Sequence, residues 1–149
     1  MKIDKEIFRE MVNFYGDVYH LPPLAAKIYA YLVFDFERQG VSFDKFVEVF
    51  AASKSSVSAN LNLLLNLKII KDFNKIDERK RFFVLNNDYI KIRFEEIIEK
   101  MQRELLILDN IKSFRHTLSE DDLAKFEMYQ NLFQKNISNI RETLDQLQK

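Results

Sequence analysis

Apolar residues recur at helical spacing along most of the chain, and the one interruption, at residues 69–85, constrains the fold most. There, Ile69–Phe73 and Arg81–Leu85 are rich in β-branched and aromatic residues and flank the polar stretch 74–80, which predicts a β-hairpin. Only two glycines and two prolines occur in 149 residues, so few turns are forced and the remainder can run as helix. We therefore expect a mainly α-helical protein with a small β-hairpin.

Four helices are expected before the hairpin. The apolar periodicity and the break at Pro22-Pro23 place them at residues 4–19, 23–39, 43–50 and 54–67. Ser42 and Ser53 are suited to cap the third and fourth helices, because a serine hydroxyl accepts from the free N–H groups of a first turn. Gly40 is expected to end the second helix. The apolar stripes expected on the first two helices are Ile7, Met11, Phe14 and Val18, and Leu24, Ile28, Tyr31, Leu32 and Phe36.

Two long helices are expected after the hairpin, over residues 88–113 and from Ser119 to the C-terminus. Ser119, with Asp122 three residues later, resembles a capping box at the start of the second one. The first would span about 39 Å at 1.5 Å per residue, which exceeds the size of the domain before it. Part of its apolar stripe must therefore project, and a projecting apolar stripe usually marks a partner surface. A second copy of the chain is the expected partner; the alternative is a helical hairpin within one chain, and both can hold together.

A short helix, a three-residue turn, a second helix and a β-hairpin are the parts of a winged helix-turn-helix. Helix 54–67 has an aliphatic inner face, with Val57, Leu61, Leu64 and Leu65, and a small polar outer face. It is therefore the expected recognition helix for the major groove, although an ordinary amphipathic surface helix would show the same pattern. The residues on this segment expected to contact DNA are Ser53, Lys54, Ser55, Ser56, Ser58, Ala59 and Asn62.

The hairpin is the expected wing, at residues 71–84. The whole chain has no net charge, but residues 53–93 hold nine Lys/Arg against four Asp/Glu, a net of +5. Local charge of this kind attracts phosphates. A solvated charge run is the alternative. The hairpin cations expected to contact the DNA backbone or minor groove are Lys75, Arg79, Lys80 and Arg81.

These segments resemble the MarR-type winged-helix regulators, and most closely the GbsR-like branch. The resemblance covers roughly residues 15–95. It rests on a Ser-Lys-x-Ser-Val-Ser-x-Asn-Leu-x-x-Leu run, a Leu-Pro-x-x-Ala-x-x-Ile-Tyr helix start and an Asp-x-Arg-Lys wing. The matching residues are Ser53, Lys54, Ser56, Val57, Ser58, Asn60, Leu61 and Leu64; Leu21, Pro22, Ala25, Ile28 and Tyr29; and Asp77, Arg79 and Lys80.

The chain also departs from the family. Lys68 stands where the family usually has glycine, and because a left-handed lysine costs on the order of 1 kcal/mol, this turn can be built differently. Ala59 stands where many members carry a larger polar residue.

The resemblance implies a homodimeric transcriptional regulator, expected to repress, that binds a palindromic double-stranded DNA operator. Arg79 would reach the minor groove, oriented by Asp77, while Asn60 would serve the boundary between helix and core. The implied segments are an N-terminal dimerisation helix at 1–20, a DNA-binding domain at 21–87 and a C-terminal dimerisation region at 88–149. A small-molecule effector would fit a pocket lined by Tyr15, Tyr19, Tyr29 and Phe94, for which core packing is the alternative.

No pattern in the sequence indicates catalysis, a cofactor or a metal. His20 and His116 lie far apart without acidic residues at ligand spacing, and there is no cysteine, glycine-rich phosphate loop or nucleophile motif. No apolar stretch is long enough for a membrane span, and the N-terminus lacks a signal peptide, so we expect a cytoplasmic protein. The alternative function is a winged-helix protein-interaction module that does not bind DNA.

Overall fold

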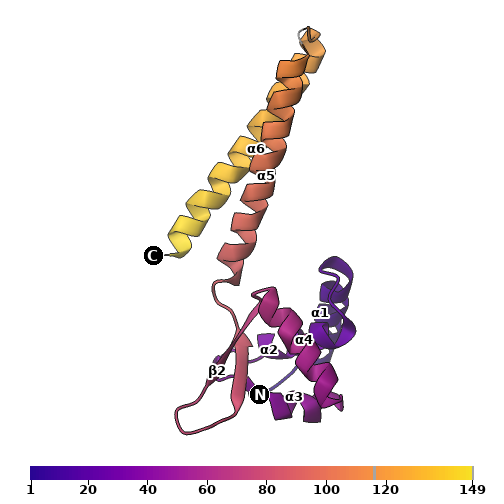
Figure 1. Cartoon of the computed structure of the whole chain (residues 1–149), viewed down its shortest axis with the longest axis vertical. Coiled ribbons are helices and arrows are strands. Elements are labelled where there is room, and N and C mark those ends of the chain that lie inside the picture. The colour runs from indigo at the N-terminus through magenta and orange to yellow at the C-terminus, as the bar shows by residue number, and fades with distance from the viewer. Residues whose placement is uncertain (116, 149) are drawn as a thin grey trace. The chain divides into compact units, whose positions relative to one another are not determined.

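The computed structural model describes residues 1–115 and 117–148, so His116 lies outside the described residues. The chain divides into two compact units, Met1–Tyr89 and Ile90–Lys149. The helices of the first unit are α1 (Lys5–Val18), α2 (Pro23–Val33), α3 (Phe43–Phe50) and α4 (Lys54–Asn66), and its strands are β1 (Val41–Ser42), β2 (Ile70–Asn74) and β3 (Arg81–Leu85). The second unit contains α5 (Tyr89–Phe114), which begins at the boundary, and α6 (Glu120–Leu147) (Figure 1).

The first unit is a winged helix. Its strands form one antiparallel sheet in the order β1-β3-β2, in which Val41 pairs with Phe83 and Ile70 pairs with Leu85. Helices α2, α3 and α4 pack against one another and against this sheet. The expected class, mainly helical with a small β wing, is therefore confirmed, and β1 adds a third strand that the sequence did not indicate.

The core of this unit is built from α2, α3, α4 and the sheet. Helix α2 is buried on most of its surface because it lies at the centre, and Ala25, Ala26 and Ile28 are fully inaccessible. Phe46 of α3 and Phe83 of β3 are the largest fully buried side chains, with ring centroids 6.2 Å apart. This core fixes the orientation of α4 and of the hairpin.

Helix α2 ends at Val33, six residues earlier than expected. The following turn is held by the Asp35 carboxylate, which accepts from the backbone N–H groups of Gln39 (3.2 Å) and Gly40 (2.8 Å). Gly40 has φ +89°, but it shapes this turn and does not cap the helix. The prediction that Phe36 belongs to the buried stripe is wrong, because Phe36 lies beyond the helix end and is 75% exposed.

Helix α1 has two apolar stripes. Asp4 caps it by accepting from Ile7 N–H at 2.9 Å. The stripe that packs on the core is Phe8, Val12, Tyr15 and Tyr19. The stripe read from the sequence lies one residue earlier, and within it Ile7, Phe14 and Val18 are about half exposed, at 50%, 49% and 54%. Helix α1 thus packs on the core of the first unit through one stripe and leaves the other apolar stripe exposed.

The second unit is a helical hairpin in which α5 and α6 run side by side in opposite directions (Figure 1). Ser119 caps α6 by accepting from Asp122 N–H at 3.1 Å, as the sequence predicted. Arg115 pairs with Asp122 (3.8 Å), and Gln130 donates to Asp109 across the two helices. Among the described residues of this unit, only a few of the many apolar ones are buried, and these are Ile98, Ile137 and Leu144.

Candidate nucleic-acid interface

Helix α4 is fixed in place by an N-terminal cap and by a buried inner face, as a recognition helix requires. The Ser53 hydroxyl accepts from Ser56 N–H at 3.2 Å and so caps the helix, as expected. Ala51 in the preceding three-residue turn adopts a left-handed conformation (φ 48°), which ends α3 and redirects the chain. Val57, Leu61 and Leu64 are 0%, 2% and 0% exposed, which confirms the predicted inner face.

The outer face of α4 is open to solvent. It is formed by small and polar side chains, and its exposed members are Ser53, Lys54, Ser55, Ser58, Ala59 and Asn62. Hydroxyl and amide groups of this kind donate to and accept from base edges, and the small size of the face allows close approach. Lys54 lies at the N-terminal end, where free N–H groups favour an anion. All of the predicted contact residues on this segment except Ser56 are exposed, and their role in contacting DNA stays a prediction.

Two residues of α4 lie at the border between its faces. Ser56 is half-buried, so it is less available than the other serines. Asn60 is also half-buried, and its Nδ2 donates to the Ser56 carbonyl oxygen at 2.8 Å. The amide of Asn60 is therefore engaged by its own helix.

A left-handed lysine connects α4 to the hairpin. Lys68 has φ 60°, Ile69 N–H donates to the Leu64 carbonyl (3.1 Å) and Lys68 N–H donates to the Leu65 carbonyl (3.0 Å). These two bonds form a Schellman motif, which usually has glycine at this position. The buried Asn86 then donates from Nδ2 to the Lys68 carbonyl at 2.8 Å and so ties the turn to the end of β3.

The stem of the hairpin is stiffened on both faces. On one face, Phe73 and Phe82 pair across the strands with centroids 5.8 Å apart, and Gly40 lies close enough that a Cβ there would be 2.7 Å from the Phe73 ring. On the other face, Arg81 donates from Nε (3.0 Å) and Nη2 (2.8 Å) to Asp72 Oδ2. Cross-strand pairs of this type hold a ladder in register.

The four cations predicted for the wing differ in their environment. Arg81 is the first residue of β3 and not part of the tip, and its charge is compensated by Asp72. Lys75 Nζ lies 4.2 Å from the centroid of the Phe82 ring. Arg79 and Lys80 are exposed, and within the described residues neither side chain has an ion-pair partner. These two are therefore the hairpin cations most available to a phosphate.

Three of the four predicted pocket residues come together in the first unit. The rings of Tyr15 and Tyr29 meet edge to face at 4.4 Å, and Tyr15 and Tyr19 lie 5.5 Å apart. Burial raises the pKa of Tyr29 well above its usual value, and the neighbouring hydroxyl of Tyr15 adds a smaller effect in the same direction. Phe94 belongs to the second unit, so a pocket that includes it stays a prediction.

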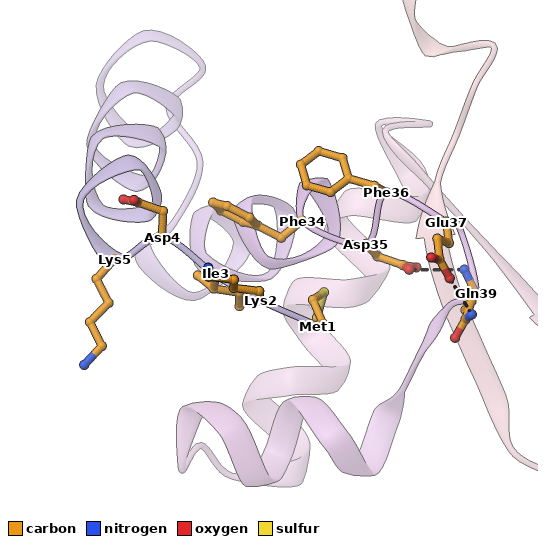
Figure 2. A pocket seen from close by; sticks show the side chains of 10 residues that line it. All are labelled: Met1, Lys2, Ile3, Asp4, Lys5, Phe34, Asp35, Phe36, Glu37 and Gln39. Carbon is orange, nitrogen blue, oxygen red and sulfur yellow. Dashed lines mark hydrogen bonds between the residues drawn. The ribbon is translucent and has the colours of Figure 1, made fainter.

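A cavity that the sequence did not indicate lies between the N-terminal segment and the turn after α2 (Figure 2). It has a volume of about 780 Å³ and is lined by residues 1–5 on one side and by Phe34, Asp35, Phe36, Glu37 and Gln39 on the other. Its residues are far apart in sequence and share no motif, so no sequence signal could have found it. The Asp35 carboxylate is already used by the turn, since it accepts from the backbone N–H groups of Gln39 (dashed in Figure 2) and Gly40.

Neither a metal centre nor a membrane span is found in the described part of the chain. Within residues 1–115 and 117–148, no three His, Asp or Glu side chains are grouped so that they could hold a metal ion. His20 is exposed, with φ 55°, in the turn after α1. No helix in the same ranges combines the length and apolarity needed to cross a bilayer.

Comparison with known proteins supports the winged-helix fold. No protein-family model and no curated protein sequence matches the chain. Among solved structures, it is similar to one described as a transcriptional regulator, at 16% identity and a TM-score of 0.61, with 96% of each chain covered. At this identity, the similarity establishes a shared fold.

Two further structures align less well. The complex of Staphylococcus aureus MepR with DNA has 16% identity and a TM-score of 0.46, covering 71% of this chain and 87% of that one. MarR has 17% identity and a TM-score of 0.42, covering 89% and 93%. Similarities with TM-scores below 0.5 add nothing to the fold established above.

Proposed function

We propose that this protein is a transcriptional regulator that binds double-stranded DNA in a sequence-specific manner. The observation that carries the proposal is the exposed Ser/Asn face of α4, whose opposite, aliphatic face is buried. The same unit holds a hairpin whose exposed cations include Arg79 and Lys80. A rigid helix with a small polar face suits the major groove, and free cations suit phosphates. The sequence motifs favour the MarR-type class, and assignment to its GbsR-like branch rests on those motifs alone.

The contacts divide between the two elements. Helix α4 lies in the major groove, where Ser55, Ser58 and Asn62 meet base edges and Lys54 meets a phosphate. The hairpin lies on the backbone and the minor groove, where Arg79 and Lys80 neutralise phosphates. Arg81 contributes by fixing the stem through Asp72.

The regulator acts as a homodimer. Support comes from the exposed stripe on α1 and from the α5–α6 hairpin, whose exposed apolar residues include Leu106, Ile107, Phe114, Met128 and Leu132. A surface this apolar favours a partner. Two-fold symmetry sets two α4 helices about 34 Å apart, one turn of DNA, and makes the operator palindromic.

Further features are proposed on two grounds: repression and the response to a ligand from the resemblance, and the cytoplasmic location and lack of catalysis from the sequence. The protein represses its target genes, works in the cytoplasm without catalytic activity, and responds to a small ligand. The tyrosine cluster on α1 and α2 supports a ligand-binding role, since neutral phenol groups can both donate and accept.

Binding to duplex DNA as a function of salt tests the proposal. Fragments of the source genome are first selected by the protein, and the strongest is titrated by fluorescence anisotropy at several KCl concentrations. With six to eight phosphate contacts in a dimer, the plot of log K against log[KCl] should have a slope of roughly −5 to −7. No selected fragment, or a flat plot, would favour the alternative, a winged-helix protein-interaction module.

A further inference from the structure

The tip of the hairpin carries an apolar side chain that is almost fully open to solvent. Ile76 is 93% exposed, more than any other large apolar residue described in this chain. It occupies the second position of a β-turn that is closed by Glu78 N–H donating to the Lys75 carbonyl at 3.0 Å. Turns favour polar residues, proline and glycine, and a β-branched side chain this exposed contributes no packing to the fold.

A single exposed apolar residue usually needs no explanation, and the location of Ile76 is what sets it apart. It projects from a corner of the turn, within four residues of Lys75, Arg79 and Lys80. Hydrophobic surface beside free cations fits a partner that is negatively charged outside and apolar inside. The minor groove of DNA has this character, since phosphates line its edges and sugar and base atoms form its walls and floor.

The hairpin is built to hold this tip in place. The Phe73–Phe82 pair and the Arg81–Asp72 ion pair brace the stem, and Asn74 Nδ2 donates to the Arg79 carbonyl at 3.3 Å across the loop. Lys75 rests on the Phe82 ring. An apolar tip on a braced stem can enter a groove without first being ordered, which lowers the entropic cost of binding.

We propose that Ile76 is an apolar minor-groove contact of the hairpin, an inference that rests on the proposed DNA-binding function. Its side chain enters the groove between phosphates contacted by Arg79 and Lys80, and packs against sugars and the edge of a base step. Apolar side chains inserted in this way partly unstack the step and bend the duplex. The contact therefore reads groove shape and deformability and carries no hydrogen-bond code.

This contact has a consequence for sequence preference. Guanine places its N2 amino group in the minor groove, where it would meet the Ile76 side chain, whereas an A·T pair leaves that space open. The positions under the hairpin should therefore prefer A·T pairs, and most strongly at flexible pyrimidine–purine steps. This preference lies outside the base pairs that α4 contacts.

The first test compares Ile76→Ser with Ile76→Val on the strongest genomic fragment. Ile76→Ser should weaken binding by about five- to twenty-fold, which is the effect of losing one partly buried aliphatic side chain, and Ile76→Val should remain close to wild type. The salt slope should be the same for all three proteins because no charge changes. Equal affinity of Ile76→Ser and wild type would overturn the inference and leave the proposed function standing.

The second test changes only the minor groove. A·T pairs under the hairpin are replaced by G·C or by inosine·C, which presents the major-groove face of G·C without the N2 amino group. Wild type should lose affinity with G·C and recover it with inosine, whereas Ile76→Ser should bind both alike. A loss that inosine does not reverse would place the contact outside the minor groove. If wild type selects no DNA at all, the proposed function itself fails.

Discussion

At the scale of single residues, Lys68 stores the clearest backbone strain. Its φ of 60° is the conformation that glycine usually supplies at the end of a helix, and the two Schellman hydrogen bonds around it leave the chain no alternative there. The lysine side chain is exposed, and the bonds that hold this turn are made by the backbone and by the Asn86 amide. The position is set by backbone geometry and not by contacts of the lysine side chain.

Replacing this lysine should stabilise the protein. Lys68→Gly removes the left-handed penalty and should raise the free energy of unfolding by up to about 1 kcal/mol, less the entropy that glycine adds to the unfolded chain. Urea denaturation followed by circular dichroism measures the change. Lys80→Gly is the matched control, since Lys80 has an ordinary negative φ and should gain nothing. A loss of stability in Lys68→Gly would contradict the assigned geometry.

The capping serines and the inward-facing residues of α4 could be predicted from sequence because their signals are local. Ser42, Ser53 and Ser119 each accept from the N–H three residues on, as a serine before a periodic apolar run predicts. The Arg81–Asp72 pair could not be predicted, because it depends on the register between two strands. The spacing of residues along the chain does not reveal the register of two strands when the turn between them lacks a glycine that would define its type.

At the scale of elements, the spacing of apolar residues predicted the helices, but it could not reveal strand β1 or the end of α2. Strand β1 has two residues, too few for an alternating pattern, and it exists because β3 offers a free edge. Helix α2 stops at Val33 because Asp35 captures the backbone of the following turn, an effect that its continuing apolar spacing concealed. Both errors lie where tertiary contacts override a local pattern.

The two arginines of the hairpin, Arg79 and Arg81, should contribute differently to DNA binding. Arg79→Ala removes an exposed cation, so it should weaken binding to all DNA sequences and make the salt slope shallower by about 0.9 for each phosphate that Arg79 neutralises. Arg81→Ala removes a cation that Asp72 already compensates, so it should change the slope little and lower stability by about 0.5 kcal/mol. The same anisotropy titrations decide this, and a larger slope change for Arg81→Ala would contradict the assignment.

At the scale of the whole molecule, the packing of a single chain leaves apolar surface exposed on α1, α5 and α6. The sequence identified a stripe on α1 at Ile7, Met11, Phe14 and Val18, and could not tell that the helix docks through the neighbouring stripe of Phe8, Val12 and Tyr15. Both stripes have the same helical period, so only tertiary packing distinguishes them. The stripe left exposed is available to a second copy.

Breaking this face should break the dimer. Phe14→Glu places a charge in the exposed stripe, where Phe14 is 49% exposed, and should shift the protein to monomer in sedimentation velocity while leaving its circular dichroism unchanged. DNA affinity should fall with it, since one monomer reaches one half-site. Phe36→Glu is the control, because Phe36 is 75% exposed but lies outside the stripe. A Phe14→Glu protein that sediments as the wild type would exclude α1 from the interface.

The DNA sequences selected by two asparagine variants test most directly whether the Ser/Asn face of α4 reads bases. Asn62 is exposed on that face, whereas Asn60 is bound to the Ser56 carbonyl of its own helix. Asn62→Ala should relax preference at one base pair in each half-site, by about 1–3 kcal/mol for a bidentate contact, and Asn60→Ala should select the wild-type sequence. Identical selected sequences for Asn62→Ala and wild type would contradict base reading by this face.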